Sequence, residues 1–285
     1  GSKGYKVEYK SSIGKRIQGS ISAKGIIFAG GVMGTIPLLL KLKQQSLPNL
    51  SDQVGCNIRT NNESLLLVTS TAKKHKDYSK GIAIGSILHT DKNSHLEPVR
   101  YGEGSGFFRM LTVPMVYSKS LLIRFFGIFS VFLKQPLKMF KTIFTKNYAK
   151  RTTVLLFMQT LDSTLQLKLG KITKMKSETE DGKKPSAFIS EALKLGKQFG
   201  KQVNGIPYAN FTDVLLGSPT TAHILGGSVM AESIEKGVID KNNNVFGYKN
   251  MLVCDGSVIS ANPGVNPSLT ITAITEHAMS KIARK

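Results

Sequence analysis

Residues 248–274 read YKNMLVCDGSVISANPGVNPSLTITAI, an apolar run followed by a polar turn and a helix-like pattern. The run at 250–254 predicts a strand buried on both faces, as in a parallel α/β sheet. Residues 255–257 follow it directly, so we expect them at the carboxyl end of the strand, where open α/β sheets bind ligands. A helix is predicted over 268–283, directly after residues 264–267, so the backbone N–H groups at its N-terminus could face an anionic group.

A second strand, turn and helix are predicted over residues 24–42. The apolar run ends at Gly30 and Gly31, and together with Gly34 these glycines let the backbone turn sharply and approach a ligand closely. The helix N-terminus that follows would suit a phosphate or another polar cofactor group. A turn that binds nothing is equally compatible with this segment, because it lacks the third glycine and the later acidic residue of a dinucleotide fingerprint.

The rest of the chain is predicted to contain strands interrupted by helices. The expected elements are a hairpin of residues 5–9 with 13–21, strands at 65–70, 81–88 and 94–101, a hairpin of 154–159 with 164–169, a polar turn at 177–184 and a helix at 186–199. We therefore predict a mixed α/β fold. An α/β domain formed by residues 1–60 and 216–285 would be interrupted by a second domain, 61–215, with a mostly antiparallel sheet and helices.

Composition narrows the class of protein. The 285 residues are 41% hydrophobic, which excludes a largely disordered chain. Cys56 and Cys254 are too few for a disulfide framework, so a reducing compartment is expected. Residues 1–18 carry no secretory signal pattern, and the chain starts without Met inside strand-like sequence. We therefore expect a fragment without its natural N-terminus, located in the cytoplasm or at the periphery of a membrane.

Positive charge gathers in one Phe-rich stretch, at about residues 104–150. The chain has 39 Lys and Arg against 18 Asp and Glu, a net charge of +21, which indicates an anionic partner. No acidic residue lies between Glu103 and Asp162, a segment that holds nine basic residues and nine of the 14 Phe. The apolar run at 121–133 is shorter than the about 20 residues that a membrane-spanning helix needs, and Pro136 would break or kink a longer helix.

Two interpretations of this stretch stay open. Its Phe and Leu side chains could enter the acyl boundary of a membrane while Lys and Arg meet anionic head groups. It could equally be a helical cap over an apolar cavity, with a solvated basic face. Nucleic acid is a less suitable partner, because a groove that tracks a nucleic-acid strand would alternate isolated aromatic residues with basic ones.

Several motifs occur in a fixed order along the chain. They are SHLEPVRYG at 94–102, AHILGG at 222–227, GYKN at 247–250, DGSVI at 255–259 and GVNPSLTITA at 264–273. With the glycine-rich segment at 29–57, this set resembles the glucose-methanol-choline (GMC) flavin oxidoreductases, most of all their cholesterol oxidase branch. The resemblance covers nearly the whole chain. The family's Gly-x-Gly-x-x-Gly motif, which holds the ADP part of FAD, is absent, which implies the C-terminal part of a longer enzyme with an FAD-binding domain incomplete at its N-terminus.

The resemblance implies FAD as the cofactor and assigns roles to particular residues. Positions that match flavin contacts of the family are Gly30, Gly31, Gly34, Asn57, Asp255, Gly256, Gly264, Asn266 and Pro267. Positions that match its catalytic residues are His223, Asn266 and Glu97. No metal is expected, because the histidines at 75, 89, 95 and 277 lack the spacing of metal ligands.

The chemistry of the three catalytic candidates suits alcohol oxidation, although each also has a simpler structural explanation. Histidine side chains can exchange protons near neutral pH, so His223 could act as general base or orient the hydroxyl group, or it could merely cap the turn at Gly226. Asn266 can donate a hydrogen bond to the flavin or to the substrate oxygen, or simply mark the start of the next helix. Glu97, in an otherwise apolar strand, could be a base or proton relay, or pair with Arg100.

The function implied by the resemblance is oxidation of a secondary alcohol, with a 3β-hydroxysteroid as the leading substrate class. A hydride would pass to flavin N5 while the hydroxyl proton is removed, and O₂ or another acceptor would reoxidise the flavin. Two alternatives stay open: an alcohol dehydrogenase of the same family acting on another hydrophobic alcohol, and a non-catalytic protein that binds lipid or membranes. An anionic membrane surface is a further expected partner.

Overall fold

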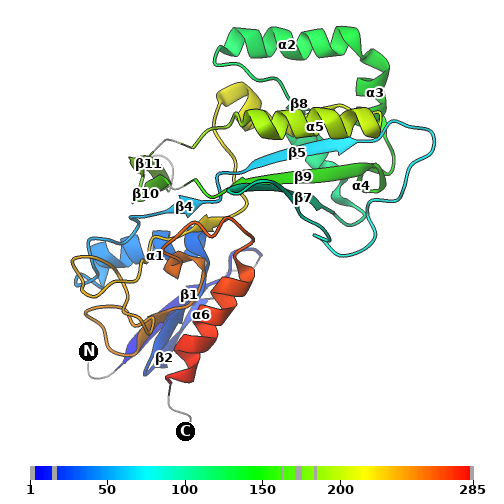
Figure 1. The fold of residues 1–285 in the computed structure, drawn as a ribbon. Helices are drawn as coiled ribbons and strands as arrows, with labels where there is room; N and C mark the ends of the chain where they lie inside the picture. Colours follow the sequence, from blue (N-terminus) through cyan, green and yellow to red (C-terminus); the bar gives the residue numbers. More distant parts are fainter. Residues whose placement is uncertain (1–3, 15–17, 162, 171–174, 183–184, 283–285) are drawn as a thin grey trace. The chain divides into compact units, whose positions relative to one another are not determined.

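The computed structural model describes residues 4–14, 18–161, 163–170, 175–182 and 185–282. The chain forms two compact units (Figure 1). Unit 1 consists of residues 1–60, 162–183 and 223–285, and unit 2 of residues 61–161 and 184–222. Unit 1 contains a parallel strand pair with helices, and unit 2 contains a six-stranded antiparallel sheet, so the predicted mixed α/β class is confirmed.

The parallel pair of unit 1 joins the two segments with buried-strand patterns. β3 (Ile26–Phe28) lies beside β14 (Met251–Val253). Because both strands run in the same direction, their carboxyl ends meet at one edge. Gly30 and Asp255, which follow these strands in the sequence, are therefore brought to the same edge.

Short antiparallel pairs and two helices complete unit 1. They are β1 (Tyr5–Lys10) with β2 (Gln18–Ala23), β4 (Arg59–Thr60) with β13 (Ile224–Leu225), β10 (Ser163–Leu169) with β11 (Met175–Gly182), α1 (Val32–Gln45) and α6 (Ser268–Ser280). Both helices lie where the sequence pattern predicts them, and the predicted hairpin is present with its second strand at residues 18–23 instead of 13–21. Residues 15–17 and 283 of the predicted elements lie outside the described ranges.

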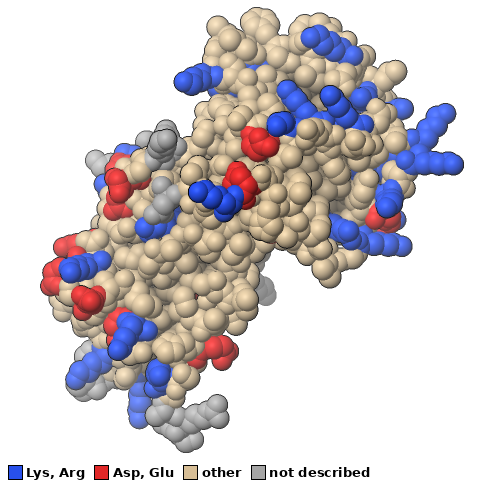
Figure 2. Space-filling model, in the orientation of Figure 1, with Lys and Arg blue, Asp and Glu red and all other residues tan. Residues whose placement is uncertain are grey.

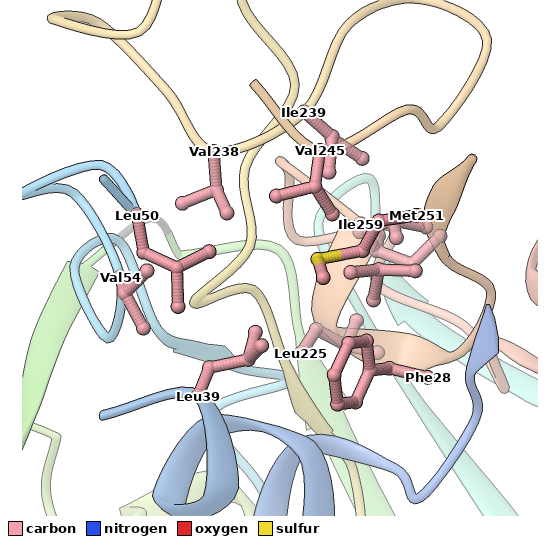
Figure 3. Close-up of a cluster of buried hydrophobic side chains, with 12 residues drawn as sticks. Phe28, Leu39, Leu50, Val54, Leu225, Val238, Ile239, Val245, Met251 and Ile259 are labelled. Atoms are coloured by element: carbon pink, nitrogen blue, oxygen red, sulfur yellow. The ribbon is translucent and has the colours of Figure 1, made fainter. Parts of the chain in front are cut away.

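The core of unit 1 packs α1 against the strands and the loops between residues 225 and 259 (Figure 3). Its buried side chains are Phe28, Leu39, Leu50, Val54, Leu225, Val238, Ile239, Val245, Met251, Val253, Val258 and Ile259. These residues come from opposite ends of the sequence, so their removal from water holds the two ends of the chain together. The edge at which β3 and β14 end is fixed by this packing.

Unit 2 is built on one antiparallel sheet. The strand order is β6–β7–β9–β5–β12–β8, formed by β5 (Ser64–Thr69), β6 (Leu88–Asp91), β7 (Ser94–Val99), β8 (Thr112–Pro114), β9 (Thr152–Gln159) and β12 (Pro207–Asn210). α5 (Ser190–Gln202) covers one face, where Leu66 and Phe157 are fully buried beside Ala192 of the helix. Gly196 allows this close packing, because a methyl group there would lie 2.8 Å from Leu66 Cδ1.

The Phe-rich stretch forms helices in unit 2. They are a short 3₁₀ helix, η1 (Ser105–Leu111), and the α-helices α2 (Leu121–Lys134), α3 (Pro136–Phe144) and α4 (Tyr148–Arg151). Pro136 occupies the first turn of α3, where its missing N–H costs no helical hydrogen bond, so it marks the boundary between two helices. Within the described ranges, no helix is both long and apolar enough to cross a membrane.

The structure corrects the predicted hairpin of residues 154–159 with 164–169. β9 pairs with β5 and β7 in unit 2, whereas β10 pairs with β11 in unit 1. The predicted second domain, 61–215, is therefore interrupted by residues 162–183, which belong to unit 1. The reason is long-range pairing: Leu165 N donates to Ile58 O, and Leu167 N to Gly55 O, both at 2.8 Å.

Two further local predictions are wrong. Residues 177–182 of the polar turn predicted at 177–184 belong to strand β11, and residues 183 and 184 lie outside the described ranges. The side chains of β11 are mostly exposed, so its polar composition carried no strand signal. The strand predicted at 81–88 is reduced to β6, which begins at residue 88. Ile82 and Ile87 are 70% and 45% exposed, and Ile84 is joined to β7 by an isolated bridge. The apolar side chains of this run are therefore not buried against another element, and no longer strand forms.

Candidate cofactor site and active site

Asp255 is the centre of a buried hydrogen-bond network at the edge where β3 and β14 end. Its Oδ1 accepts hydrogen bonds from Ser257 N at 2.8 Å and Ser257 Oγ at 2.6 Å, and its Oδ2 accepts one from Thr35 Oγ1 at 2.5 Å. Thr35 Oγ1 in turn accepts a hydrogen bond from Gly30 N at 3.1 Å. This carboxylate therefore ties the end of β14 to the glycine turn and to α1.

The N-terminus of α1 is a second feature of this edge. Gly31 occupies the N-cap position with φ 67°, a backbone conformation that favours glycine, and the first turn of the helix carries no acidic residue. A methyl group at Gly31 or Gly34 would meet no atom of the described chain within 4 Å, so this side of the turn is open. An open helix N-terminus can accept an anionic or electron-rich group of a ligand.

The segment after His223 is fixed to the turn after Asp255 by backbone hydrogen bonding. Gly226 N donates to Gly256 O at 3.1 Å. Gly226 has φ 82°, and a methyl group at this position would collide with Asn57 O. Glycine is therefore required at position 226, and the close packing brings Asn57 and Gly256, two of the predicted flavin positions, next to the same residue.

Gly256 also lies between the segments that carry His223 and Asn266. A methyl group at Gly256 would lie 3.5 Å from Ile224 O and 3.4 Å from Ile271 Cδ1. Ile224 follows His223 directly, and Ile271 lies in the first turn of α6, five residues after Asn266. Two of the three catalytic candidates are thus carried by segments that converge on one glycine of unit 1.

The turn before α6 is shaped by its own polar groups. Gly264 has φ 64°, and its N–H donates to Asn262 Oδ1 at 2.8 Å. Pro267 occupies the N-cap position of α6, where its carbonyl accepts a hydrogen bond from Ile271 N at 2.9 Å. The predicted flavin positions in this turn therefore lie at a helix N-terminus, as the sequence pattern indicates.

Glu97, the third catalytic candidate, lies in unit 2 on β7. Alternation along the strand puts His95 and Glu97 on one face and Leu96 on the face covered by α5. His95 Nε2 lies 3.4 Å from Glu97 Oε1, and both residues are only 4% exposed. The alternative partner Arg100 donates through Nη1 to the carbonyl of Lys80. His95, which the sequence offered only as a histidine without metal spacing, is thus the neighbour of the candidate carboxylate.

Glu63 is a buried carboxylate that the sequence motifs did not single out. It is 4% exposed, and it accepts hydrogen bonds from Thr221 Oγ1 and, at 3.1 Å, from Ala222 N. These two donors immediately precede His223 in the chain, so Glu63 holds the backbone that leads into the candidate base. The available signal was a polar run, residues 61–63, directly before the apolar strand β5.

The two cysteines lie near the site but have the properties of core residues. Both are buried and free, and burial raises the pKa of the Cys56 and Cys254 thiols, which keeps them protonated at neutral pH. Among the residues that the structure describes, no three His, Cys, Asp or Glu side chains form a cluster able to hold a metal ion.

Comparison with known proteins gives the family. Residues 174–275 match the family model described as GMC oxidoreductase. A cholesterol oxidase of Acinetobacter baumannii is 38% identical over 296 aligned residues, which cover 100% of this chain and 52% of that protein. The chain therefore carries a GMC oxidoreductase domain over residues 174–275. A second relative, a cholesterol oxidase of Mycobacterium tuberculosis, is 32% identical over 277 residues, 93% of this chain and 48% of its own length.

The chain spans about half the length of the two cholesterol oxidases that it matches. Its fold is similar to the crystal structure of pyridoxine 4-oxidase from Mesorbium loti, with a TM-score of 0.51 at 13% identity. That match covers 99% of this chain and 55% of the other. The predicted resemblance to GMC oxidoreductases is confirmed by the family model and by the cholesterol oxidase relatives, and because GMC oxidoreductases are flavoproteins, the domain implies FAD.

Proposed function

We propose that this chain is part of an FAD-dependent oxidoreductase that oxidises a secondary alcohol on a hydrophobic substrate. The observation that carries the proposal is the convergence around Gly256 of the segments that carry His223 and Asn266, beside the open N-terminus of α1. Unit 1 would bind the cofactor and unit 2 the substrate. The similarity to cholesterol oxidases over the whole chain supports this assignment.

The residues of unit 1 fit FAD. When bound, FAD supplies the flavin N5 that accepts a hydride. The residues that would hold it are Gly30, Gly31 and Gly34 at the turn before and within α1, Asn57, Asp255 and Gly256, and Gly264, Asn266 and Pro267 before α6. Both oxygens of Asp255 already accept hydrogen bonds from the chain, so this carboxylate would act by holding the turn in place.

The catalytic candidates would have two kinds of role, proton transfer and orientation of the substrate hydroxyl group. His223 would take the proton from the substrate hydroxyl group, and Glu63 would hold the two residues before it. Asn266 would donate a hydrogen bond to the substrate oxygen or to the flavin. Glu97 would relay a proton, with His95 at 3.4 Å as its neighbour.

A 3β-hydroxysteroid is the substrate class we propose, because the relatives from Acinetobacter baumannii and Mycobacterium tuberculosis are both cholesterol oxidases. O₂ or another electron acceptor would then reoxidise the flavin.

Anaerobic stopped-flow reduction of the flavin tests the proposal. The full-length protein should be yellow, and a 3β-hydroxysteroid should bleach its visible absorbance. His223→Ala should slow this step by about 10²–10⁴-fold, the usual contribution of a general base, without loss of flavin. The matched control His277→Ala, on an exposed position of α6, should leave the rate unchanged. Equal reduction rates in wild type and His223→Ala would refute the assigned role.

A further inference from the structure

The helix α2 exposes apolar side chains where a surface helix normally carries polar ones. Leu122, Phe125, Phe126, Phe129 and Leu133 follow a spacing of three or four residues along the outward face, and they are between 54% and 68% exposed. A helix that is apolar all round is normally buried in a protein or in a membrane. Exposed apolar patches of this kind mark interaction sites.

The inward face of α2 explains why this exposure is built into the fold. Arg124 is the one buried residue of α2; its guanidinium donates to Ser118 O at 2.6 Å and to Leu215 O at 3.2 Å, and it lies 5.1 Å from the ring centroid of Phe188. Ile128, on the same face, packs against the core of unit 2. These contacts fix the rotation of the helix, so its Phe side chains cannot turn inward.

The helix α3 extends the same surface. Its buried side is formed by Met139 and Thr142, while Leu137, Phe140 and Phe144 are 75%, 62% and 64% exposed. The rings of Phe140 and Phe144 lie against each other, with centroids 4.5 Å apart. We call the exposed apolar side chains of α2 and α3 the apolar surface.

A basic pocket opens beside the apolar surface. It has a volume of about 450 Å³ and is lined by Phe140 and Phe144 together with Lys73, Lys141, Lys146 and Arg151. None of the described residues that line it is acidic. Arg151 is partly committed to the carbonyl oxygens of residues 70 and 72, whereas the three lysines are exposed. On the face seen in Figure 2, the region of α2 and α3 is mainly uncharged, with Lys and Arg around it.

We propose that the apolar surface docks onto an anionic phospholipid bilayer and that the basic pocket receives a lipid phosphate. The exposed Phe side chains suit the acyl boundary of a bilayer, and the neighbouring lysines suit its anionic head groups. No acidic residue lies between Glu103 and Asp162 to repel those head groups. A protein partner fits less well, because protein interfaces are depleted in lysine. This inference is independent of the proposed oxidase activity, since its test measures binding alone.

Co-sedimentation of the full-length protein with vesicles tests the inference. Wild type should bind vesicles of phosphatidylcholine mixed with phosphatidylglycerol more tightly than phosphatidylcholine alone. The double variant Lys141→Gln/Lys146→Gln should lose about 30-fold in affinity for the anionic vesicles, with a smaller loss in high salt. The charge-matched control Lys236→Gln/Lys241→Gln, on exposed loops of unit 1, should bind like wild type.

A second variant separates the apolar contribution. Phe125→Ser/Phe129→Ser should reduce binding to both vesicle types by about tenfold or more, and because both side chains are exposed, its far-UV circular dichroism should match wild type. Absence of wild-type binding to anionic vesicles overturns the inference. The inference is also overturned if free inorganic phosphate abolishes all vesicle binding, because the pocket would then be a site for small anions. The apolar surface would instead be assigned to a second copy of the chain if two results were found together: Phe125→Ser/Phe129→Ser leaves vesicle binding unchanged, and the same variant converts a wild-type dimer into monomers.

Discussion

Replacement of Thr35 by valine tests the network that joins the two halves of the candidate cofactor site. Thr35 is 1% exposed, and its hydroxyl donates to Asp255 Oδ2 at 2.5 Å while accepting from Gly30 N. Valine keeps the shape but removes the hydroxyl group. A hydrogen bond to a charged group contributes about 1.5–3 kcal/mol, whereas Gly30 N lies in an exposed turn where water can replace the lost acceptor. We therefore expect a loss of about 2 kcal/mol in the free energy of unfolding.

Urea unfolding of the full-length protein, followed by far-UV circular dichroism, gives the measurement. The matched control is Thr272→Val on α6, where the same change removes a hydroxyl group that is exposed and donates only to Ser268 O of its own helix. The control should change stability by less than about 0.5 kcal/mol. The reasoning is refuted if Thr35→Val and Thr272→Val unfold at the same urea concentration.

Three further predictions concern buried charges. Arg124→Met should lower the free energy of unfolding by about 2–4 kcal/mol, because it removes a guanidinium that donates hydrogen bonds to several backbone carbonyl groups. The control Lys134→Met, at an exposed position, should lower it by less than about 0.5 kcal/mol in the same urea assay. Burial raises the pKa of Asp213 in the folded state, so its favourable contribution is present below the unfolded pKa and lost as pH rises through the folded pKa. Asp213→Asn should therefore gain stability relative to wild type as the pH rises above about 4, by about 1.4 kcal/mol for each pH unit that separates the folded and unfolded pKa. A difference in urea midpoints that does not change with pH would contradict this. Glu63→Gln should lower kcat by about tenfold with flavin retained, because one of two acceptors for residues 221–222 is lost, and the exposed Glu8→Gln should leave kcat unchanged.

The parts of the fold that the sequence predicts are those governed by local patterns. The apolar runs of β3 and β14, the glycines after β3 and the helix α6 each follow from spacing within about 15 residues. The position of Asp255 at the end of a buried strand follows from the same pattern. Its use as an acceptor for Thr35, which is 220 residues away in the chain, does not, because no local period encodes that contact.

The partition of β9 and β10 illustrates what local patterns leave open. Both have strand-like patterns, and a hairpin is the shortest connection between them. In the structure each strand finds a longer-range partner: β9 inserts between β5 and β7, and β10 joins β11 beside the loop at 55–58. The choice depends on which apolar faces can be buried together, and this is a property of the whole chain.

The Phe-rich stretch shows the same division between local pattern and long-range packing. That residues 104–150 are basic, apolar and free of acidic residues is visible in the chain itself, because composition and spacing are local properties. That Arg124 turns inward and the Phe side chains outward depends on tertiary contacts, since the backbone carbonyl groups that accept from Arg124 include one at residue 215. The family motifs at 222–273 can likewise be recognised in the sequence alone. Their convergence on Gly256 depends on the packing of unit 1, because removal of apolar surface from water brings the two ends of this sequence together.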